Sequence, residues 1–363
     1  MLECLRQTVE IESPSSSKPG VDRLANFLAK EFRKCAGKVS LLKHPVAGSA
    51  VSAKFWAGRL SQKPILLLGH LDTVWEVGTL AQMPFRVRAG RAFGPGILDM
   101  KSGIVIGFWA IRALQALKIS PTSPIHFFLN SDEEVSSVAF RKEILAEAQG
   151  ARAVLVLEAA AAGGALKTAR KGVGEFKITV RGRSAHAGVS PAAGANAITE
   201  LMRQLFTIQA IPLSQKGLTI NVGRIEGGTR SNVVPERATA WIDVRIPRLQ
   251  DRAFIEKEIG GRRPYDPRTQ LEIEGGINRP PMERNMAAAL FRKARALGQA
   301  MGMDLTEAST GGGSDGNFTA ALGIPTLDGL GGVGDGAHAR HEHILIRELP
   351  RRAALLAGLL ARP

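Results

Sequence analysis

The sequence contains only two cysteines, Cys4 and Cys35, among 363 residues. Two cysteines cannot form a disulfide framework, and their scarcity excludes a cysteine-rich metal site. Long apolar runs are absent as well, because no stretch approaches the roughly 18 residues that a membrane span needs, and the aliphatic run at 353–360 is too short. The beginning of the chain lacks the basic and apolar regions of a signal peptide. We therefore expect a cytoplasmic protein without a membrane partner.

Aromatic residues are scarce, at 5% of the chain, whereas basic residues are in excess. Lys and Arg number 48 and Asp and Glu number 33, which gives a net charge of +15. Such a charge can attract nucleic acid. However, the cations are scattered along the chain and few aromatics accompany them. We therefore expect no nucleic-acid partner, and we assign the positive field to the attraction of a small anionic substrate.

Strand-like and helical patterns alternate in the first half of the chain. Apolar runs at 65–68, 125–129 and 154–157 are typical of buried strands, and a helical period at 103–117 lies between the first two. This alternation predicts an α/β fold with a mostly parallel sheet that is covered on both faces. The length of 363 residues favours about two domains.

A different pattern begins at Gly174, where apolar and polar residues alternate as in a half-exposed antiparallel strand. The order of elements from there is β-α-β-β-α-β, which is the ferredoxin-like α+β pattern. Glycine-rich segments at 171–174 and 275–281 indicate flexible junctions on either side of it. We therefore expect a small domain at 173–282, inserted into a larger domain formed by 1–172 and 283–363. Within the small domain the expected helices are 193–209 and 249–259, and the later strands are 218–226, 236–245 and 270–274.

A histidine, His70, lies just past the apolar run at 65–68, in the segment 69–74. Ligands of α/β folds bind at the carboxyl ends of strands. Residues two apart on an extended chain point the same way, so Asp72 can lie beside His70 and orient its ring. A buried core histidine followed by a helix N-cap explains this segment equally well when it is considered alone.

Further acidic and imidazole side chains have a similar placement. Glu133, Glu134 and Glu158 follow two other strand-like runs, Asp99 lies in a turn-rich loop before a helix, and His338 lies in a loop near the C-terminus. A solvated charge run or an acidic strand end explains each of these segments alone. Their shared placement favours a site for two divalent ions, because two such ions need about this many ligands when one carboxylate bridges them. If Glu133 and Glu134 are extended, their side chains diverge, so one can bind metal while the other faces the water between the ions.

In this order along the chain, the motifs resemble those of the co-catalytic zinc peptidases of the glutamate carboxypeptidase (carboxypeptidase G) type. That family also contains aminoacylases, acetylornithine deacetylases and succinyl-diaminopimelate desuccinylases. The resemblance covers nearly the whole chain and implies two zinc ions, with cobalt or manganese as alternatives. The metal ligands that it implies are His70, Asp99, Glu134, Glu158 and His338.

The resemblance also implies individual roles. Asp99 corresponds to the bridging ligand, Asp72 to the acid behind the first histidine, and Glu133 to the general base. His338 is selected over its neighbouring histidines because the family places this ligand four residues before a glutamate, here Glu342. A metal-containing protein without catalytic activity is disfavoured, since such a protein would not need Glu133 or Asp72.

In the small domain the resemblance points to substrate contacts and to a partner subunit. His186 corresponds to a histidine that reaches the active site of the neighbouring subunit, which implies a homodimer. Asn232, Arg245 and Gly312 fall in stretches that contact the substrate or line its pocket. Arg279 falls where glutamate-releasing members hold the substrate carboxylate, although a cation in a hinge loop explains its position equally well.

The implied activity is that of a metal-dependent exopeptidase that cleaves the amide bond to a C-terminal amino acid. Its substrate would be a small peptide or N-acyl amino acid, its larger domain catalytic, and its small domain a dimerisation or lid domain. The alternative is an N-acyl amino acid deacylase of the acetylornithine deacetylase or aminoacylase type. Ser102 and Ser136 stand where many relatives have glycine, which leaves the choice of substrate open.

Overall fold

A computed structural model describes residues 1–58, 60–211 and 216–362 of the chain. Contacts between residues divide it into two compact units. Unit 1 comprises Met1–Ala169, Met282–Thr310 and Ser314–Pro363, and unit 2 comprises Arg170–Pro281 and Gly311–Gly313. Over the described ranges, no helix has the length and apolar character needed to span a membrane.

Unit 1 is built on a six-stranded sheet with the order β1-β2-β6-β3-β7-β14. The central strand β3 pairs in parallel with β6 and β7, and β14 continues the parallel part beside β7. Strands β1 and β2 form an antiparallel edge that the sequence patterns did not predict. The expected mostly parallel sheet is confirmed. Its strands are β1 (Lys38–Leu42), β2 (Ala50–Phe55), β3 (Ile65–His70), β6 (Ile125–Asn130), β7 (Ala153–Val156) and β14 (Thr326–Leu327).

Both faces of the β3 strand are buried. Ile65 and Leu67 belong to one apolar cluster, which includes residues of α2, α3, α7 and α9, whereas Leu66 and Leu68 belong to a second cluster that includes residues of α4. Alternate residues of a strand point to opposite faces. A continuous aliphatic run is therefore what a sheet covered on both sides requires.

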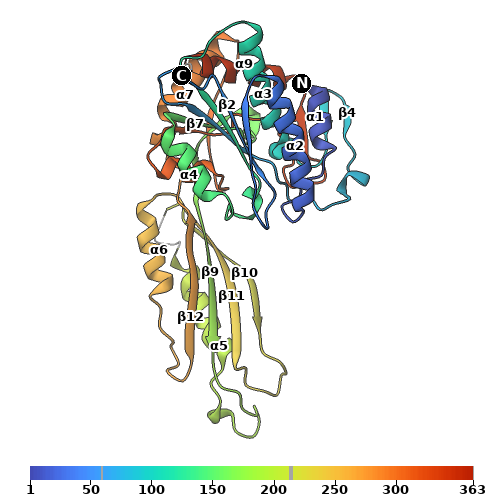
Figure 1. Cartoon of the computed structure of the whole chain (residues 1–363). Helices are drawn as coiled ribbons and strands as arrows, with labels where there is room; N and C mark the ends of the chain where they lie inside the picture. Colours follow the sequence, from blue (N-terminus) through green and yellow to red (C-terminus); the bar gives the residue numbers. More distant parts are fainter. Residues whose placement is uncertain (59, 212–215, 363) are drawn as a thin grey trace. The chain divides into compact units, whose positions relative to one another are not determined.

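The helices of unit 1 cover this sheet (Figure 1). Helix α2 begins at Lys18, because Ser17 caps it by accepting a hydrogen bond from the Gly20 amide at 3.3 Å and Pro19 fits the first turn. The helices of this unit are α1 (Leu2–Val9), α2 (Lys18–Lys34), α3 (Ser102–Ala116), α4 (Arg141–Gly150), α7 (Arg284–Ala300), α8 (Gly316–Ala321) and α9 (Glu348–Ala361).

Short strands complete unit 1. An antiparallel sheet has the order β15-β16-β5-β4, and β13 pairs with β8. Several of these strands contain only two or three residues, which is too few for a periodic sequence signal. Their bounds are β4 (Arg86–Arg88), β5 (Arg91–Phe93), β8 (Leu166–Arg170), β13 (Glu307–Thr310), β15 (Gly334–Asp335) and β16 (His343–Leu345).

Unit 2 has the predicted ferredoxin-like order of elements, β9-α5-β10-β11-α6-β12. Its four strands form one antiparallel sheet in the order β10-β11-β9-β12. Helices α5 and α6 pack on this sheet over a separate apolar core. The elements are β9 (Gly172–Arg181), α5 (Ala197–Gln209), β10 (Thr219–Gly227), β11 (Arg237–Ile246), α6 (Gln250–Gly260) and β12 (Gln270–Arg279).

Most of the two glycine-rich segments expected as flexible junctions lies in strands. Gly174 lies within β9, and Gly275 and Gly276 lie within β12, where these two strands pair. A Cβ atom at Gly275 would lie 2.1 Å from the carbonyl oxygen of Glu175, and the φ of Gly275 is +101°. The glycines therefore permit a close approach of two strands. The boundaries of unit 2, at Arg170 and Pro281, lie at these segments, but the expected loop conformation of their glycines is wrong.

Candidate metal centre

His70 is the last residue of β3 and is 1% exposed. Its Nδ1 lies 2.9 Å from the backbone carbonyl oxygen of Asp72 and 3.4 Å from the carboxylate Oδ1 of the same residue. The ring is thus oriented by Asp72, as expected, with the carbonyl group as the nearer acceptor. This arrangement leaves Nε2 directed at the carboxylates on the other side of the ring.

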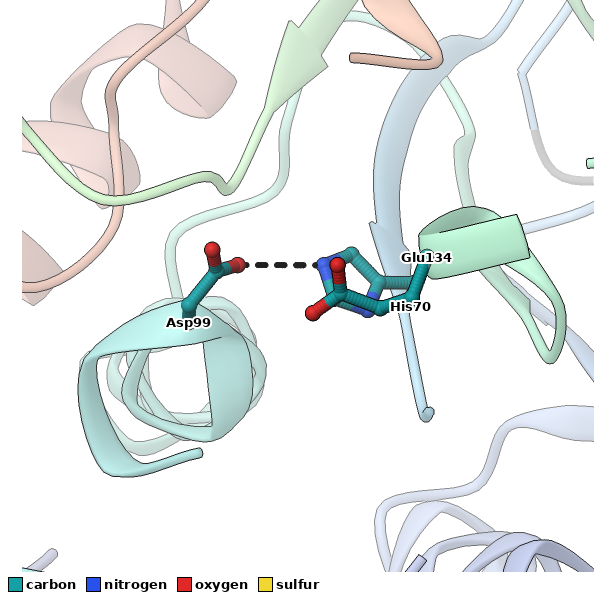
Figure 2. A group of neighbouring side chains, drawn as sticks. All are labelled: His70, Asp99 and Glu134. Atoms are coloured by element: carbon teal, nitrogen blue, oxygen red, sulfur yellow. Dashed lines mark hydrogen bonds and ion pairs between the residues drawn. The ribbon is translucent and has the colours of Figure 1, made fainter. Parts of the chain in front are cut away.

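Asp99 lies between two histidines and offers a different oxygen to each. Its Oδ1 is 3.2 Å from Nε2 of His70, and its Oδ2 is 3.3 Å from Nε2 of His338. Figure 2 shows the Asp99 carboxylate aimed at the His70 ring, with Glu134 beside them. A carboxylate that faces two imidazoles through its two oxygens has the geometry of a bridging metal ligand.

Each histidine also meets one further carboxylate. Glu158, two residues past the end of β7, has its Oε1 3.4 Å from Nε2 of His70. Glu134 has its Oε1 3.3 Å from Nε2 of His338. The five side chains therefore form two sets, each with one histidine and one glutamate, and the two sets share Asp99.

The distances within each set fit a divalent ion better than a hydrogen-bond network. Two ligand atoms on a tetrahedral zinc ion lie about 3.3 Å apart when each is about 2.0–2.1 Å from the ion. Oε1 of Glu134 is also buried and has no hydrogen-bond partner among the described residues, although Nε2 of His338 lies 3.3 Å away. Ligand atoms of His70, Asp99 and Glu134 come within 4.8 Å of one another. A divalent ion between His338 and Glu134 would satisfy this buried oxygen of Glu134.

The electrostatics of these groups agree with this assignment. Burial alone lowers the pKa of His70, but the carboxylates of Asp72, Asp99 and Glu158 outweigh it and hold this pKa well above the usual value. The pKa of His338 is raised to about 10 by Asp99 and Glu134. Without metal, both rings are therefore protonated at neutral pH, and the two protons take the place of the positive charge that the carboxylates require.

The acidic turn, residues 132–137, differs from its predicted conformation. Glu133 and Glu134 begin a one-turn 3₁₀ helix (Glu133–Val135), so the prediction of an extended segment was wrong. The reason is Asp72, whose Oδ1 accepts the amide of Glu133 and whose Oδ2 accepts the amide of Glu134, both at 3.1 Å. Successive side chains of a 3₁₀ helix still diverge, by about 120°. The turn therefore lets the two glutamates point in different directions.

Glu342 is a functional residue for which the sequence offers one signal, its spacing from His338. It is fully buried, and its carboxylate accepts the amides of Gly96, Leu98 and Asp99 at 2.8–3.1 Å. The indole of Trp75 donates a further hydrogen bond at 2.8 Å. Burial raises the pKa of Glu342. This glutamate thus shapes the loop that presents Asp99.

The remaining predicted residues belong to unit 2. His186 is exposed, and its Nδ1 accepts the amides of Gly188 and Val189 at 3.2 Å. In the neutral ring the proton is then on Nε2, which can donate a hydrogen bond outward. Asn232 is exposed. Its backbone carbonyl oxygen accepts a hydrogen bond from the amide of Ala187 at 3.0 Å, so Asn232 lies beside the segment of His186.

The two predicted arginines differ in environment. Arg245 is half-buried and makes a two-pronged ion pair with Asp243, at 2.7 and 2.8 Å. Arg279 ends β12 and is 5% exposed. Gly312 is exposed, and its carbonyl oxygen accepts a hydrogen bond from Arg170 at 3.0 Å. The five candidate metal ligands, in contrast, all belong to unit 1.

Comparisons with known proteins agree with this geometry. A family model described as peptidase family M20/M25/M40 matches residues 66–362. Carboxypeptidase G2 of Pseudomonas sp. (strain RS-16) is 30% identical over an alignment that covers 99% of this chain and 88% of that protein. A succinyl-diaminopimelate desuccinylase of Thioalkalivibrio sulfidiphilus is 26% identical, with 85% of this chain and 86% of that protein covered.

Solved structures share the fold. The aminopeptidase PepT from Bacillus cereus superposes with a TM-score of 0.81 at 21% identity, over 99% of this chain and 97% of that chain. A dinuclear metal-binding peptidase of the M20 family from Bacillus subtilis has a TM-score of 0.69 at 13% identity, over 99% and 96% of the two chains. The mixed α/β architecture with an additional antiparallel domain is therefore that of these peptidases.

The raised pKa values of the two histidines predict that metal binding releases protons. Both rings must lose a proton before they bind an ion, so addition of Zn²⁺ to the metal-free protein near pH 7 is expected to release up to about two protons per chain. Metal affinity is expected to fall as the pH is lowered. Calorimetric titration in buffers of different ionisation enthalpy measures this release, and His338→Ala is expected to lower it. A metal affinity that does not change between pH 6 and pH 8 would contradict the assignment.

Proposed function

The chain belongs to peptidase family M20/M25/M40, and we propose that it is an exopeptidase that hydrolyses the amide bond to a C-terminal amino acid, as a glutamate carboxypeptidase does. The observation that carries this proposal is the pair of histidine–glutamate sets that share Asp99. The similarity to carboxypeptidase G2 over nearly the whole chain supports the choice of substrate class. Unit 1 would be the catalytic domain, and unit 2 a dimerisation and lid domain.

The proposed metal ligands form two sets. His70 and Glu158 would hold one ion and His338 and Glu134 the other, with Asp99 between them. A set of imidazole and carboxylate ligands suits zinc, and it also accepts cobalt or manganese. Two divalent ions at such a site supply Lewis acidity, which activates water near neutral pH and polarises the scissile carbonyl.

Glu133 is the proposed general base. It takes a proton from the attacking water and delivers it to the leaving nitrogen, so the amide breaks into a carboxylic acid and a free amine. Its backbone amide is fixed by Asp72, which also orients His70. Asp72 also accepts the amide of Glu134, so it fixes the backbone of the base relative to that of the neighbouring ligand.

His186 is the proposed donor to the oxygen of the tetrahedral intermediate, and it would act in the active site of a partner subunit. The Nδ1 acceptor role described above leaves an N–H on Nε2 that can donate to a developing oxyanion. Since the side chain is exposed on unit 2, it is accessible to a second molecule.

A homodimer through unit 2 has support from the surface of that unit. Strand β10 forms one edge of the sheet and is largely exposed, with Ile225 59% accessible. On helix α5, Met202 and Phe206 are 65% and 79% accessible and lie four residues apart on one face, whereas the opposite face of the helix is buried. A sheet edge beside exposed apolar side chains is typical of an interface.

The candidate substrate contacts are Asn232, Arg245, Arg279 and Gly312. An arginine is suited to bind a carboxylate through two hydrogen bonds. Arg245 already makes this kind of contact with Asp243, so a substrate carboxylate at this position has to exchange with that partner. The net charge of +15 favours the approach of an anionic substrate.

The free cysteines Cys4 and Cys35 support a cytoplasmic location.

The second candidate function is deacylation of N-acyl amino acids, which the similarity to succinyl-diaminopimelate desuccinylase supports. The metal-reconstituted protein should therefore be tested against two matched substrate sets. Folate-type and peptidyl glutamates form one set, and N-acetyl and N-succinyl amino acids form the other. A higher kcat/KM for the first set is expected. A preference for the second set would identify the deacylase, and no hydrolysis of either set would contradict both functions.

The separate roles of the adjacent glutamates predict different mutant phenotypes. Glu133→Gln is expected to lower kcat by a factor of about 10² to 10⁴ while the protein still binds two metal ions. Glu134→Gln is expected to lose one ion, because it removes a charged ligand. Metal content after dialysis and steady-state kinetics measure the two effects. Equal loss of metal in the two variants would overturn the assigned roles.

The exposed apolar face of α5 predicts that Phe206→Asp weakens self-association by a factor of about 10 or more. Sedimentation velocity over a concentration series measures this change. Leu117→Asp is the matched control, because Leu117 is 70% exposed but lies in unit 1, and this variant is expected to associate like the wild type. A wild-type protein that stays monomeric at high concentration would contradict the proposed dimer.

A further inference from the structure

We infer that Asp315 is a positioning residue that holds the acidic turn in the conformation needed by Glu133 and Glu134. This inference rests on the proposed function, because it concerns how the proposed base and one proposed ligand are placed. Asp315 lies in the glycine-rich segment 311–317 of the sequence, far along the chain from the acidic turn.

The acidic turn needs support from outside because its backbone is strained. Two consecutive residues at its end, Ser136 and Ser137, have φ values of +77° and +53°. Residues with a side chain rarely adopt this left-handed conformation, because their Cβ atom comes too close to the following carbonyl oxygen. Such strain persists where the surrounding structure holds the chain in place.

One hold on the turn is Asp72, which accepts the amides of Glu133 and Glu134 at its beginning. The second hold acts at its end. Oγ of Ser137 donates a hydrogen bond to Oδ1 of Asp315, and Nδ2 of Asn130 donates to Oδ2 of Asp315 at 2.9 Å. The carboxylates of Asp72 and Asp315 thus accept hydrogen bonds from opposite ends of the acidic turn.

The hydrogen-bonded residues around Asp315 are buried, and one of them, Asn130, belongs to the strand β6 that pairs with β3. Asn130 and Ser137 are fully buried and are themselves hydrogen-bonded at 3.0 Å, and Asp315 is 3% exposed. Asn130 is the last residue of β6 and pairs in register with His70 of β3. Its side-chain oxygen also accepts the amide of Ser131 at 2.7 Å. The acidic turn is therefore tied to the same sheet edge that carries His70.

The orientation of the Asp315 side chain argues against an ordinary structural role. Asp315 occupies the N-cap position of helix α8, where an aspartate side chain commonly accepts a backbone amide of the first turn. Here it makes no such capping hydrogen bond. Both of its carboxylate oxygens accept hydrogen bonds from outside the helix, from Ser137 and Asn130.

Loss of this hold is expected to affect one metal position more than the other. The acidic turn contributes Glu134 to the set with His338, whereas the set with His70 uses Glu158, which follows β7. Residues that orient metal ligands without binding the metal typically contribute a factor of about 10–100 in affinity or activity. Asp315→Ala is therefore expected to weaken one of two metal equivalents by about that factor, and to lower kcat similarly with little change in KM.

The experiment is a Zn²⁺ titration against a competing chelator, combined with steady-state kinetics on a substrate from the panel above. Asp315→Asn keeps one acceptor oxygen and is expected to lie between the wild type and Asp315→Ala. Ser137→Ala removes the hydroxyl that donates to Asp315 and accepts from Asn130, and it tests the same contact with the turn if Asp315→Ala does not fold. Glu200→Gln is the control, because Glu200 is 2% exposed and accepts two backbone amides in unit 2, so its loss reports general destabilisation.

Unchanged affinity for both metal equivalents in folded Asp315→Ala and Ser137→Ala would overturn the inference. Equal weakening of both equivalents, matched by Glu200→Gln, would also overturn it, because a general loss of stability then explains the result. The metal titration does not depend on any substrate. If the wild-type protein binds two ions but hydrolyses nothing in the panel, the proposed function fails while the role of Asp315 is still decided by the titration.

Discussion

The contact of Asp99 with both histidines is the interaction on which the rest of the site depends. Three carboxylates and two imidazoles gather there, and a group of acids in a largely buried place is unfavourable without compensating positive charge. With a proton added to each imidazole, the three carboxylates and two histidines together carry one net negative charge. With two divalent ions and neutral imidazoles, the same site carries one net positive charge. Only the metal-bound form therefore favours the negative charge that develops when water attacks an amide.

The surrounding structure holds this arrangement by means of buried carboxylates that accept backbone amides. Glu342 shapes the loop of Asp99, and Asp72 shapes the beginning of the acidic turn. Each uses both of its oxygens on neighbouring groups, which fixes the backbone more firmly than a single contact. The backbone around the ligands is thus fixed by hydrogen bonds within the protein, so the cost of ordering this backbone belongs to folding.

The sequence predicts the parts of the site that lie directly at strand ends. His70 and Glu158 follow aliphatic runs that can only be buried strands, so their meeting at one sheet edge follows from the parallel fold. The conformation of Glu133 and Glu134 could not be predicted, because an amide contact with Asp72, some 60 residues earlier, decides it. The strand conformation of the glycines in β12 could not be predicted for a similar reason, since a glycine marks either a loop or a close approach of two backbones, and the distant partner strand decides which.

The choice of substrate depends on residues outside the metal centre, because peptidase and deacylase chemistry need the same ions and the same base. A carboxylate on the leaving amino acid requires a cation, and Arg245 is already bound by both oxygens of Asp243. A substrate that replaces Asp243 must match its two-pronged geometry, and a substrate without a carboxylate leaves the pair intact. Such an exchange weakens binding of carboxylates and leaves the binding of a neutral substrate unaffected, so it lowers the discrimination against neutral amides. The ion pair of Arg245 with Asp243 therefore opposes selection of a carboxylate by Arg245, unless the substrate carboxylate matches the two-pronged geometry better than Asp243 does.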